Sequence, residues 1–220
     1  MEREWSTVNS WFTFEHFNIA PSHMEVPVVA LNRDGERCVQ MMHWPLRPVW
    51  SKGETVSYKT HNARSETMQE KSSFKLSWSR GWRCLVPMVG FYEWQVVEGQ
   101  KIKQPWFICL PDHPQPAMAG LWCSSKTPEG EAVLSFTIIT LSANELMAKI
   151  SNDKKRMPLI LKPEDYNTWL GGSVEEASAL VQPYPSARME AWPVGTYINR
   201  PDNNDEQCME AVNKKVVSGQ

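Results

Sequence analysis

One carboxylate in this sequence stands in surroundings that are poor in water. Glu93 lies among Phe91, Tyr92 and Trp94, shortly after an apolar run at 84–88 that is typical of a buried strand. Aromatic neighbours take water away from a carboxylate, and a partly desolvated carboxylate can exchange protons near neutral pH. Glu93 is therefore a candidate general acid or base. The alternative is a glutamate at a strand end with its side chain in solvent.

A second polar group occupies residues 62–67, where an amide, a guanidinium, a hydroxyl and a carboxylate follow one another closely. Directional donors and acceptors at this density suit a phosphate or a sugar, which makes Asn62 and Arg64 candidate binding residues. Each has a structural alternative. Asn62 is also suited to capping a helix, and Arg64 to an ion pair with Glu66 or Glu70.

Three further polar positions stand out. Asn18 and Pro21 belong to the run 17–21, in which the proline imposes an extended conformation on the residue before it. Arg156 precedes the apolar run 157–161 and is suited either to clamping a phosphate or to capping a neighbouring helix.

The charge of the chain gives no overall attraction for nucleic acid, because its formal net charge is −2. Binding of a polyanion would need a local patch, and the segments 149–156 and 71–83 are both basic. The second one interleaves Phe74, Trp78 and Trp82, a composition suited to stacking bases beside phosphate contacts. Solvated loops also collect lysines, so the alternative of an ordinary surface remains open.

The elements that must position these residues are mostly strands. A turn signal at 32–35 predicts a hairpin between 25–31 and 37–43. We expect further strands at 83–88, 91–97, 105–110, 117–124 and 134–140, and helices at 144–149, 163–170 and 173–181. The pattern favours a β-rich α+β fold, with a mainly antiparallel, barrel-like sheet core and peripheral helices. We expect one domain over residues 1–212 and a frayed tail over 213–220.

Composition excludes several classes of protein. The 220 residues are 41% hydrophobic and contain no apolar stretch long enough to span a membrane. The first residues lack the apolar core of a signal peptide, so we expect a cytoplasmic protein. The five cysteines show no paired C-x-x-C spacing, which argues against a disulfide framework and a structural zinc site. We expect no metal and no cofactor.

A set of short motifs recurs in a recognisable order. They are Asn-x-Ala-Pro at 18–21, Trp44 with Pro48 and Trp50, Asn-Ala-Arg-x-Glu-Thr at 62–67, Gly-Phe-x-Glu-Trp at 90–94, Gln-Pro-x-Phe-Ile at 104–108, Ala-Gly-Leu-Trp at 119–122, Phe-Thr-Ile-Ile-Thr at 136–140 and Arg-Met-Pro at 156–158. Over about residues 17–212, the chain resembles the SRAP family of SOS-response-associated, abasic-site processing proteins.

The resemblance implies a DNA-damage protein that recognises abasic sites in single-stranded DNA, or at junctions of single and double strand. The family forms a covalent thiazolidine crosslink with the ring-opened aldehyde, using the amine and thiol of an N-terminal cysteine. It implies that Asn62 holds the opened sugar and that Glu93 moves protons. The implied DNA contacts are Asn18, Pro21, Trp44, Arg64 and Arg156. We expect a monomer that is associated with the nucleoid when bound to DNA.

The sequence departs from the family pattern at two places. The family begins Met-Cys-Gly-Arg, whereas this sequence begins Met1-Glu2-Arg3-Glu4, and Ser151 stands where the family has a histidine. Either the start is altered or the chain is a divergent member without the covalent step, so its enzymatic activity stays open. His23 or His61 could reach the site in space. The alternatives are a non-catalytic module for single-stranded DNA and a peptidase-like hydrolase with Glu93 as general base.

Overall fold

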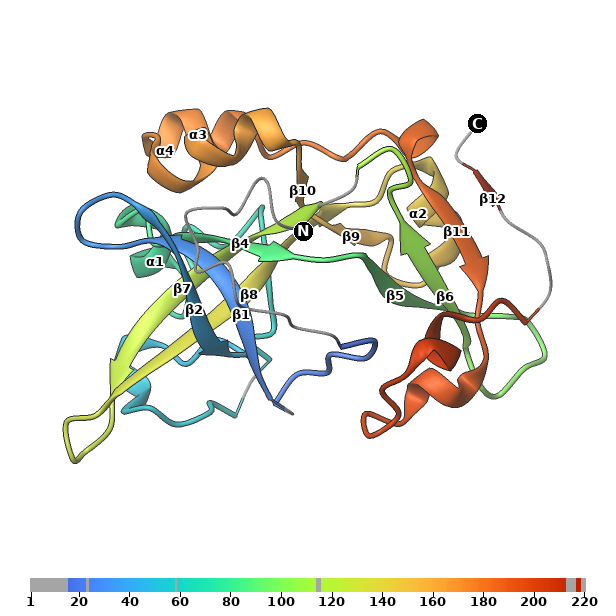
Figure 1. Ribbon diagram of the computed structural model, residues 1–220, viewed down its shortest axis with the longest axis horizontal. Coiled ribbons are helices and arrows are strands. Elements are labelled where there is room, and N and C mark those ends of the chain that lie inside the picture. The colour runs from blue at the N-terminus through green and yellow to red at the C-terminus, as the bar shows by residue number, and fades with distance from the viewer. Residues whose placement is uncertain (1–15, 23, 58, 114–115, 213–216, 219–220) are drawn as a thin grey trace.

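The computed structural model describes residues 16–22, 24–57, 59–113, 116–212 and 217–218. Two sheets lie side by side, a ring-like sheet and a smaller second sheet (Figure 1). The fold is mixed α+β and rich in strands, as the sequence predicts. No helix in these described ranges is long and apolar enough to cross a membrane.

The ring is formed by five strands whose first and last members pair with each other. Its order is β7 (Ala117–Lys126), β4 (Arg83–Pro87), β1 (Glu25–Leu31), β2 (Arg37–His43) and β8 (Ala132–Ser142), and the pairing of β7 with β8 closes it. Three short strands extend this sheet: β3 (Asn62–Arg64) and β9 (Arg156–Pro158) pair with β8, and β10 (Ile160–Leu161) pairs with β7. The pairings are antiparallel except those of β2 and β3 with β8, which are parallel. The expected barrel-like core is therefore confirmed.

The second sheet has the order β12 (Val217–Ser218), β11 (Glu190–Pro193), β6 (Gln104–Cys109) and β5 (Gly90–Gln95). Val217 and Ser218 pair with Ala191 and Glu190. The expectation of a frayed tail over 213–220 is wrong at these two residues, because backbone pairing with β11 holds them; residues 213–216 and 219–220 lie outside the described part of the chain.

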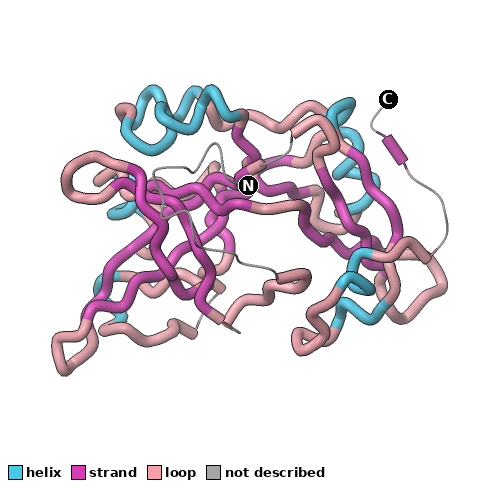
Figure 2. Tube along the Cα trace, in the orientation of Figure 1, coloured by secondary structure: helices cyan, strands magenta, loops and turns pink. Residues whose placement is uncertain are grey.

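The helices are short and lie around the sheets (Figure 2). They are α1 (Lys75–Ser79), α2 (Glu145–Ile150), α3 (Tyr166–Gly171) and α4 (Val174–Ala179), with 3-10 turns η1 (Val49–Ser51), η2 (Pro163–Asp165), η3 (Ser186–Arg188), η4 (Thr196–Asn199) and η5 (Glu206–Met209). Local sequence explains where two of them begin. The Asn144 side chain accepts a hydrogen bond from the Met147 N–H at the start of α2, and Ser173 and Glu176 form a capping box at the start of α4.

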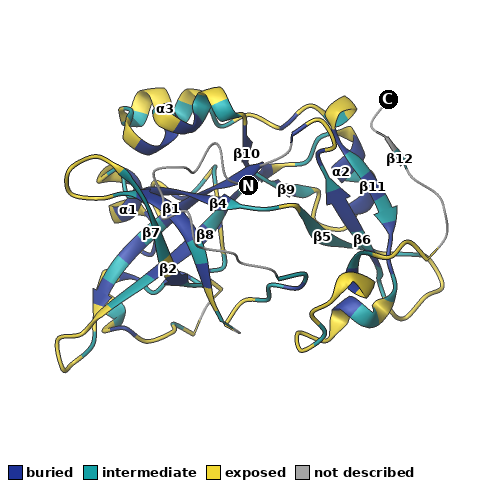
Figure 3. Cartoon of the chain, viewed as in Figure 1, coloured by how far each residue is buried: buried dark blue, intermediate teal, exposed yellow. Residues whose placement is uncertain are grey.

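The hydrophobic core fills the ring and continues beneath α3 (Figure 3). It includes the fully buried side chains of Leu85, Leu121 and Trp169. Arg83 is also buried: its guanidinium donates to the carbonyl oxygens of Trp169 and Gly172, at the end of α3. A buried arginine needs such partners, so Arg83 ties β4 to α3.

The basic and aromatic segment 71–83 divides between core and surface. Phe74 and Trp78 are buried in the core, and the guanidinium of Arg83 is taken by the carbonyl oxygens named above, so packing explains these three residues. Lys71, Lys75 and Arg80 are exposed, and binding of a polyanion by them stays a prediction.

Candidate nucleic-acid interface

The strand β3 presents two of the predicted site residues on one side. Asn62 and Arg64 are exposed, whereas Ala63 between them is fully buried. Successive side chains of a strand point to opposite faces, so Asn62 and Arg64 share the solvent side. The parallel pairing of Asn62 with Ile138 and of Arg64 with Thr140 fixes this register. The alternative of Asn62 as a helix cap is wrong, because the residue lies in a strand.

The charged side chain of Arg64 is available for binding. Within the described ranges its guanidinium has no hydrogen-bond or ion-pair partner, although its backbone carbonyl accepts from Thr67 and Met68. The alternative of an ion pair with Glu66 is wrong, because Arg156 takes that carboxylate. A free, exposed guanidinium is available to a phosphate.

Trp44 lies directly beside β3. Its indole N–H donates to the His61 carbonyl oxygen at 2.8 Å, and its ring stacks on Phe136 with centroids 6.1 Å apart. The Ser22 N–H donates to the Trp44 carbonyl at 2.5 Å, which brings the exposed turn containing Pro21 to the same place. The predicted residues Pro21, Trp44 and Asn62 are thus brought together. We call Trp44, His61, Asn62 and Arg64 the β3 surface.

His61 contributes a half-buried ring to this surface. It meets Trp44 edge to face, with ring centroids 6.5 Å apart. Burial lowers the pKa of His61, and the positive charges of Lys59 and Lys154 lower this pKa further. The imidazole is therefore neutral at pH 7 and has two cations nearby.

Arg156 has a different role from Arg64. Its guanidinium donates to both carboxylate oxygens of Glu66, at 2.6 and 2.9 Å, and to the Thr140 carbonyl at 2.6 Å. The hydrogen bond from Arg156 is the main cause that lowers the pKa of the Glu66 carboxyl. The sequence suggested that Arg156 clamps a phosphate or caps a helix. In the structure its guanidinium instead joins β9 to the turn after β3. Its role as a DNA contact stays a prediction.

Glu93 lies on β5, in the second sheet. It is half-buried, and its Oε1 accepts a hydrogen bond from the Trp94 N–H at 3.0 Å. Phe91 and Gln95 share its face of the strand; Phe91 packs against the core of the ring, and Gln95 donates to the Lys149 carbonyl of α2. The face that carries Glu93 is therefore turned toward the ring and α2, whereas Tyr92 packs on the opposite side against Phe107.

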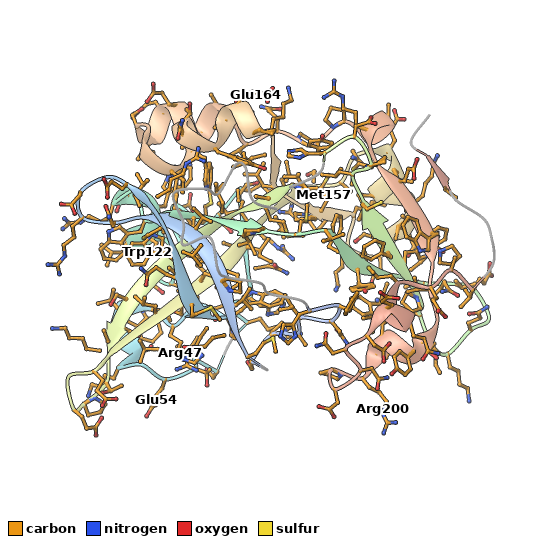
Figure 4. All side chains as sticks on the ribbon, viewed as in Figure 1. Arg47, Glu54, Trp122, Met157, Glu164 and Arg200 are labelled. Atoms are coloured by element: carbon orange, nitrogen blue, oxygen red, sulfur yellow. The ribbon has the colours of Figure 1, made fainter. Side chains whose placement is uncertain are left out.

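The loop 151–155 joins the two parts of the candidate site. The Asn152 side chain accepts from the Val96 N–H at 2.9 Å and donates to the Val96 carbonyl at 2.8 Å, just beyond β5. Asp153 pairs with Lys103. The loop then enters β9, which lies between the ring and the second sheet (Figure 1); Met157 of this strand is labelled in Figure 4.

Ser151, where the family pattern has a histidine, is fully buried at the end of α2. Within the described residues its hydroxyl has no hydrogen-bond partner. A fully buried side chain cannot touch a bound ligand without rearrangement of the loop. Ser151 therefore does not replace an exposed imidazole at this site.

Asn18 fastens the first described residues to the segment 198–203. Its side-chain amide is buried and donates to the carbonyl oxygens of Ile198, Arg200 and Asn203, at 3.0–3.2 Å. It thus fixes the turn after η4, near Arg200 in Figure 4. These contacts give Asn18 a structural role, and its contact with DNA stays a prediction.

Sequence reasoning pointed to the run 149–156 as a basic patch and to His61 as a residue that could reach the site, but it missed the contacts of the loop. Asn152 and Lys154 lie in a segment that looks only like a basic loop, and no local signal shows that the loop is fastened to β5. His61 was recognisable only as a histidine next to a polar motif. No group of three His, Cys, Asp or Glu side chains in the described ranges is arranged to hold a metal ion.

The fold and the β3 surface define a single strand-rich domain with an exposed amide and guanidinium beside an indole. The sequence model of the family described as SOS response associated peptidase (SRAP) matches residues 2–201. The chain belongs to this family.

Relatives and solved structures agree with this assignment. The chain is 36% identical over 198 residues to the abasic site processing protein YoqW of Bacillus subtilis, covering 89% of the chain and 85% of the relative. It is 36% identical over 200 residues to the abasic site processing protein HMCES of Xenopus tropicalis, covering 80% of the chain and 58% of the relative. A crystal structure of a protein from Bacteroides thetaiotaomicron superimposes with a TM-score of 0.73 at 29% identity, covering 86% of this chain and 82% of that one.

Proposed function

We propose that the protein recognises abasic sites in DNA, in single strands or at junctions of single and double strand, through the β3 surface. The observation that carries the proposal is the exposed pair Asn62 and Arg64, whose side chains have no partner in the described part of the chain. An exposed polar pair on a rigid strand is suited to binding, because no protein interaction must first be broken.

Each group of the surface matches one part of damaged single-stranded DNA. Arg64 supplies a charge-assisted hydrogen bond to a phosphate, and the Asn62 amide can donate to a sugar oxygen. The indole of Trp44, which is half-buried, offers an aromatic edge beside them to a neighbouring base. An opened sugar without a base leaves room that an intact nucleotide would fill. The relatives YoqW and HMCES are named abasic site processing proteins, which supports this assignment.

The five internal cysteines are not suited to forming a thiazolidine. A thiazolidine needs an amine and a thiol on one residue, and all five cysteines are internal, with their nitrogens in peptide bonds. Burial also raises the pKa of Cys84, and it raises that of Cys109 and Cys123 to about 11. Thiols in this state are poor nucleophiles.

Fluorescence anisotropy with labelled oligonucleotides tests the proposal. Single-stranded DNA that contains a tetrahydrofuran abasic analogue should bind more tightly than blunt duplex, with an affinity that falls as salt rises. Arg64→Ala should weaken binding by about 1–3 kcal/mol. Arg33→Ala is the matched control, because Arg33 is an exposed cation in the β1–β2 turn, at the opposite end of the hairpin from Trp44. Equal affinity for duplex and single strand, or equal losses in the two variants, would overturn the proposal.

A further inference from the structure

The loop 151–155 places an amine close to the β3 surface. Three contacts fasten the loop: Asn152 binds the Val96 backbone twice, Asp153 pairs with Lys103, and the Lys155 N–H donates to the Ser151 carbonyl at 2.6 Å. The next residue, Arg156, is bound to Glu66, which stands two residues after the end of β3. Lys154 therefore lies between the contacts of Asn152 and Asp153 on one side and those of Arg156 on the other.

Lys154 itself is exposed and has no hydrogen-bond or ion-pair partner among the described residues. The adjacent acid, Asp153, is taken by Lys103. Lys154 is nevertheless near enough to His61 for its charge to affect the ring, and His61 directly precedes Asn62. The anchored loop thus holds a primary amine two residues before Arg156, whose guanidinium reaches the turn that follows β3.

We propose that Lys154 forms an imine with the aldehyde of an abasic site bound at the β3 surface, an inference that rests on the function proposed above. The ligand class is an aldehyde on a polyanion. Lys154 lies in the run 150–156, where the family pattern has a histidine.

The reaction needs no reagent beyond the two partners. The neutral amine attacks the aldehyde carbon, a C–N bond forms, and the carbonyl electron pair moves to oxygen, which takes a proton. The nitrogen loses a proton, the C–O bond breaks, water leaves, and a C=N bond remains. Amine and aldehyde give imine and water. Water can reverse each step, so the product is a reversible adduct.

Two neighbours suit these proton transfers. The His61 imidazole can pass protons between water and the aldehyde oxygen, while water takes the proton that the lysine ammonium must lose before attack. Glu93 lies on the strand to whose end the loop is fastened, and its carboxylate faces the ring and α2. Glu93 lies on β5, and His61 directly precedes β3.

The test uses the full chain and an oligonucleotide with a true aldehydic abasic site. Borohydride reduces the C=N bond to a secondary amine, and the trapped complex is separated on a denaturing gel. Lys154→Arg keeps the charge but removes the nucleophilic amine, and Lys155→Arg is the matched control on the next residue. We expect Lys154→Arg to lower the trapped yield about tenfold or more and Lys155→Arg to leave it within about twofold. Proteolysis and mass spectrometry should place the modification on Lys154.

Binding is measured separately with the tetrahydrofuran analogue, which has no aldehyde and reports recognition alone. Intact binding with no trapped adduct, or with an adduct on the amine of Met1 or on another lysine, would overturn the role of Lys154 and leave the proposed function standing. Failure of the unmodified protein to bind the analogue would overturn both.

Discussion

Arg156 and Glu66 meet across β8 in a two-pronged ion pair. Thr140 of β8 pairs with Arg64 of β3 on one edge and with Pro158 of β9 on the other, so the two short strands flank β8. Arg156 comes from the β9 side and Glu66 follows β3, and their side chains are joined by hydrogen bonds of 2.6 and 2.9 Å. The pair therefore locks the strand that carries Asn62 and Arg64 to the strand that follows the lysine loop.

The ion pair should contribute stability that depends on pH. Glu66→Gln should lower the free energy of unfolding at pH 7 by up to about 1 kcal/mol, a modest value because the Glu66 side chain is about half exposed, at 49%. The pKa of Glu66 is lowered in the folded state, so this stability is present above the unfolded pKa and is lost as pH falls through the folded pKa. Urea denaturation of both proteins at pH 7 and pH 3 checks this. An undiminished difference at pH 3 would contradict it.

Arg156 and Arg64 should differ in what their substitution affects: Arg156 should matter for stability and Arg64 for DNA binding. Arg156→Ala should lower the free energy of unfolding by about 1–2 kcal/mol, because Glu66 and the Thr140 carbonyl lose their donor. Arg64→Ala should change stability by less than about 0.5 kcal/mol, since its exposed guanidinium has no hydrogen-bond or ion-pair partner among the described residues. Denaturation curves and DNA anisotropy on the same samples test the separation. A stability loss in Arg64→Ala equal to that in Arg156→Ala would show that the assigned roles are wrong.

Glu93 should act in proton transfer and not in binding. Glu93→Gln should keep the fold and the affinity for the tetrahydrofuran analogue, because the amide oxygen can still accept from the Trp94 N–H. It should slow borohydride-trappable reaction with the aldehyde by about 10²-fold. Glu98→Gln, in the exposed β5–β6 turn, is the control. Unchanged rates in Glu93→Gln would assign this carboxylate to structure alone.

Asn18 should matter for stability. Asn18→Ala removes the amide that binds three backbone carbonyls, and we expect a loss of about 1–3 kcal/mol in the free energy of unfolding. Thermal unfolding followed by circular dichroism measures the effect. If the variant keeps full stability and loses DNA affinity, then Asn18 acts as a DNA contact.

Restoring the family start tests the missing thiol. The triple variant Glu2→Cys, Arg3→Gly and Glu4→Arg allows removal of Met1, so that one residue carries both a free amine and a thiol. It should form a heat-stable adduct with abasic single-stranded DNA, which the unmodified chain should not form without borohydride. Absence of this adduct would indicate that burial of Ser151 in place of a histidine disables ring closure.

Local signals predicted the long elements well. The Asn32–Gly35 turn and the alternating residues around it gave the bounds of β1 and β2, Glu25–Leu31 and Arg37–His43, as they are found. Capping residues likewise predicted the start of α2 and α4. In these elements the determining interactions join residues that are close in the sequence.

The short elements of the site could not be predicted in this way. Strand β3 has three residues and exists because its backbone pairs with β8, far along the chain. For the same reason the sequence suggested Arg64 as a partner of Glu66, whereas the strand order brings Arg156 to this carboxylate. The family resemblance identified Asn62, Arg64 and Glu93, but it gave no information on the contacts of loop 151–155.

The burial of Ala63 determines which way the neighbouring side chains of Asn62 and Arg64 point. Strand side chains alternate, so a shift of β3 by one residue along β8 would turn Asn62 and Arg64 into the interior and bring Ala63 to the surface. Burying the Asn62 amide and the Arg64 charge would cost free energy, because neither would have a hydrogen-bond partner inside. The space beneath the strand fits the methyl side chain of Ala63, and this also opposes the shift. A substitution of Ala63 by a larger residue should therefore weaken DNA binding by Asn62 and Arg64, although the Ala63 side chain itself has no polar or reactive atom.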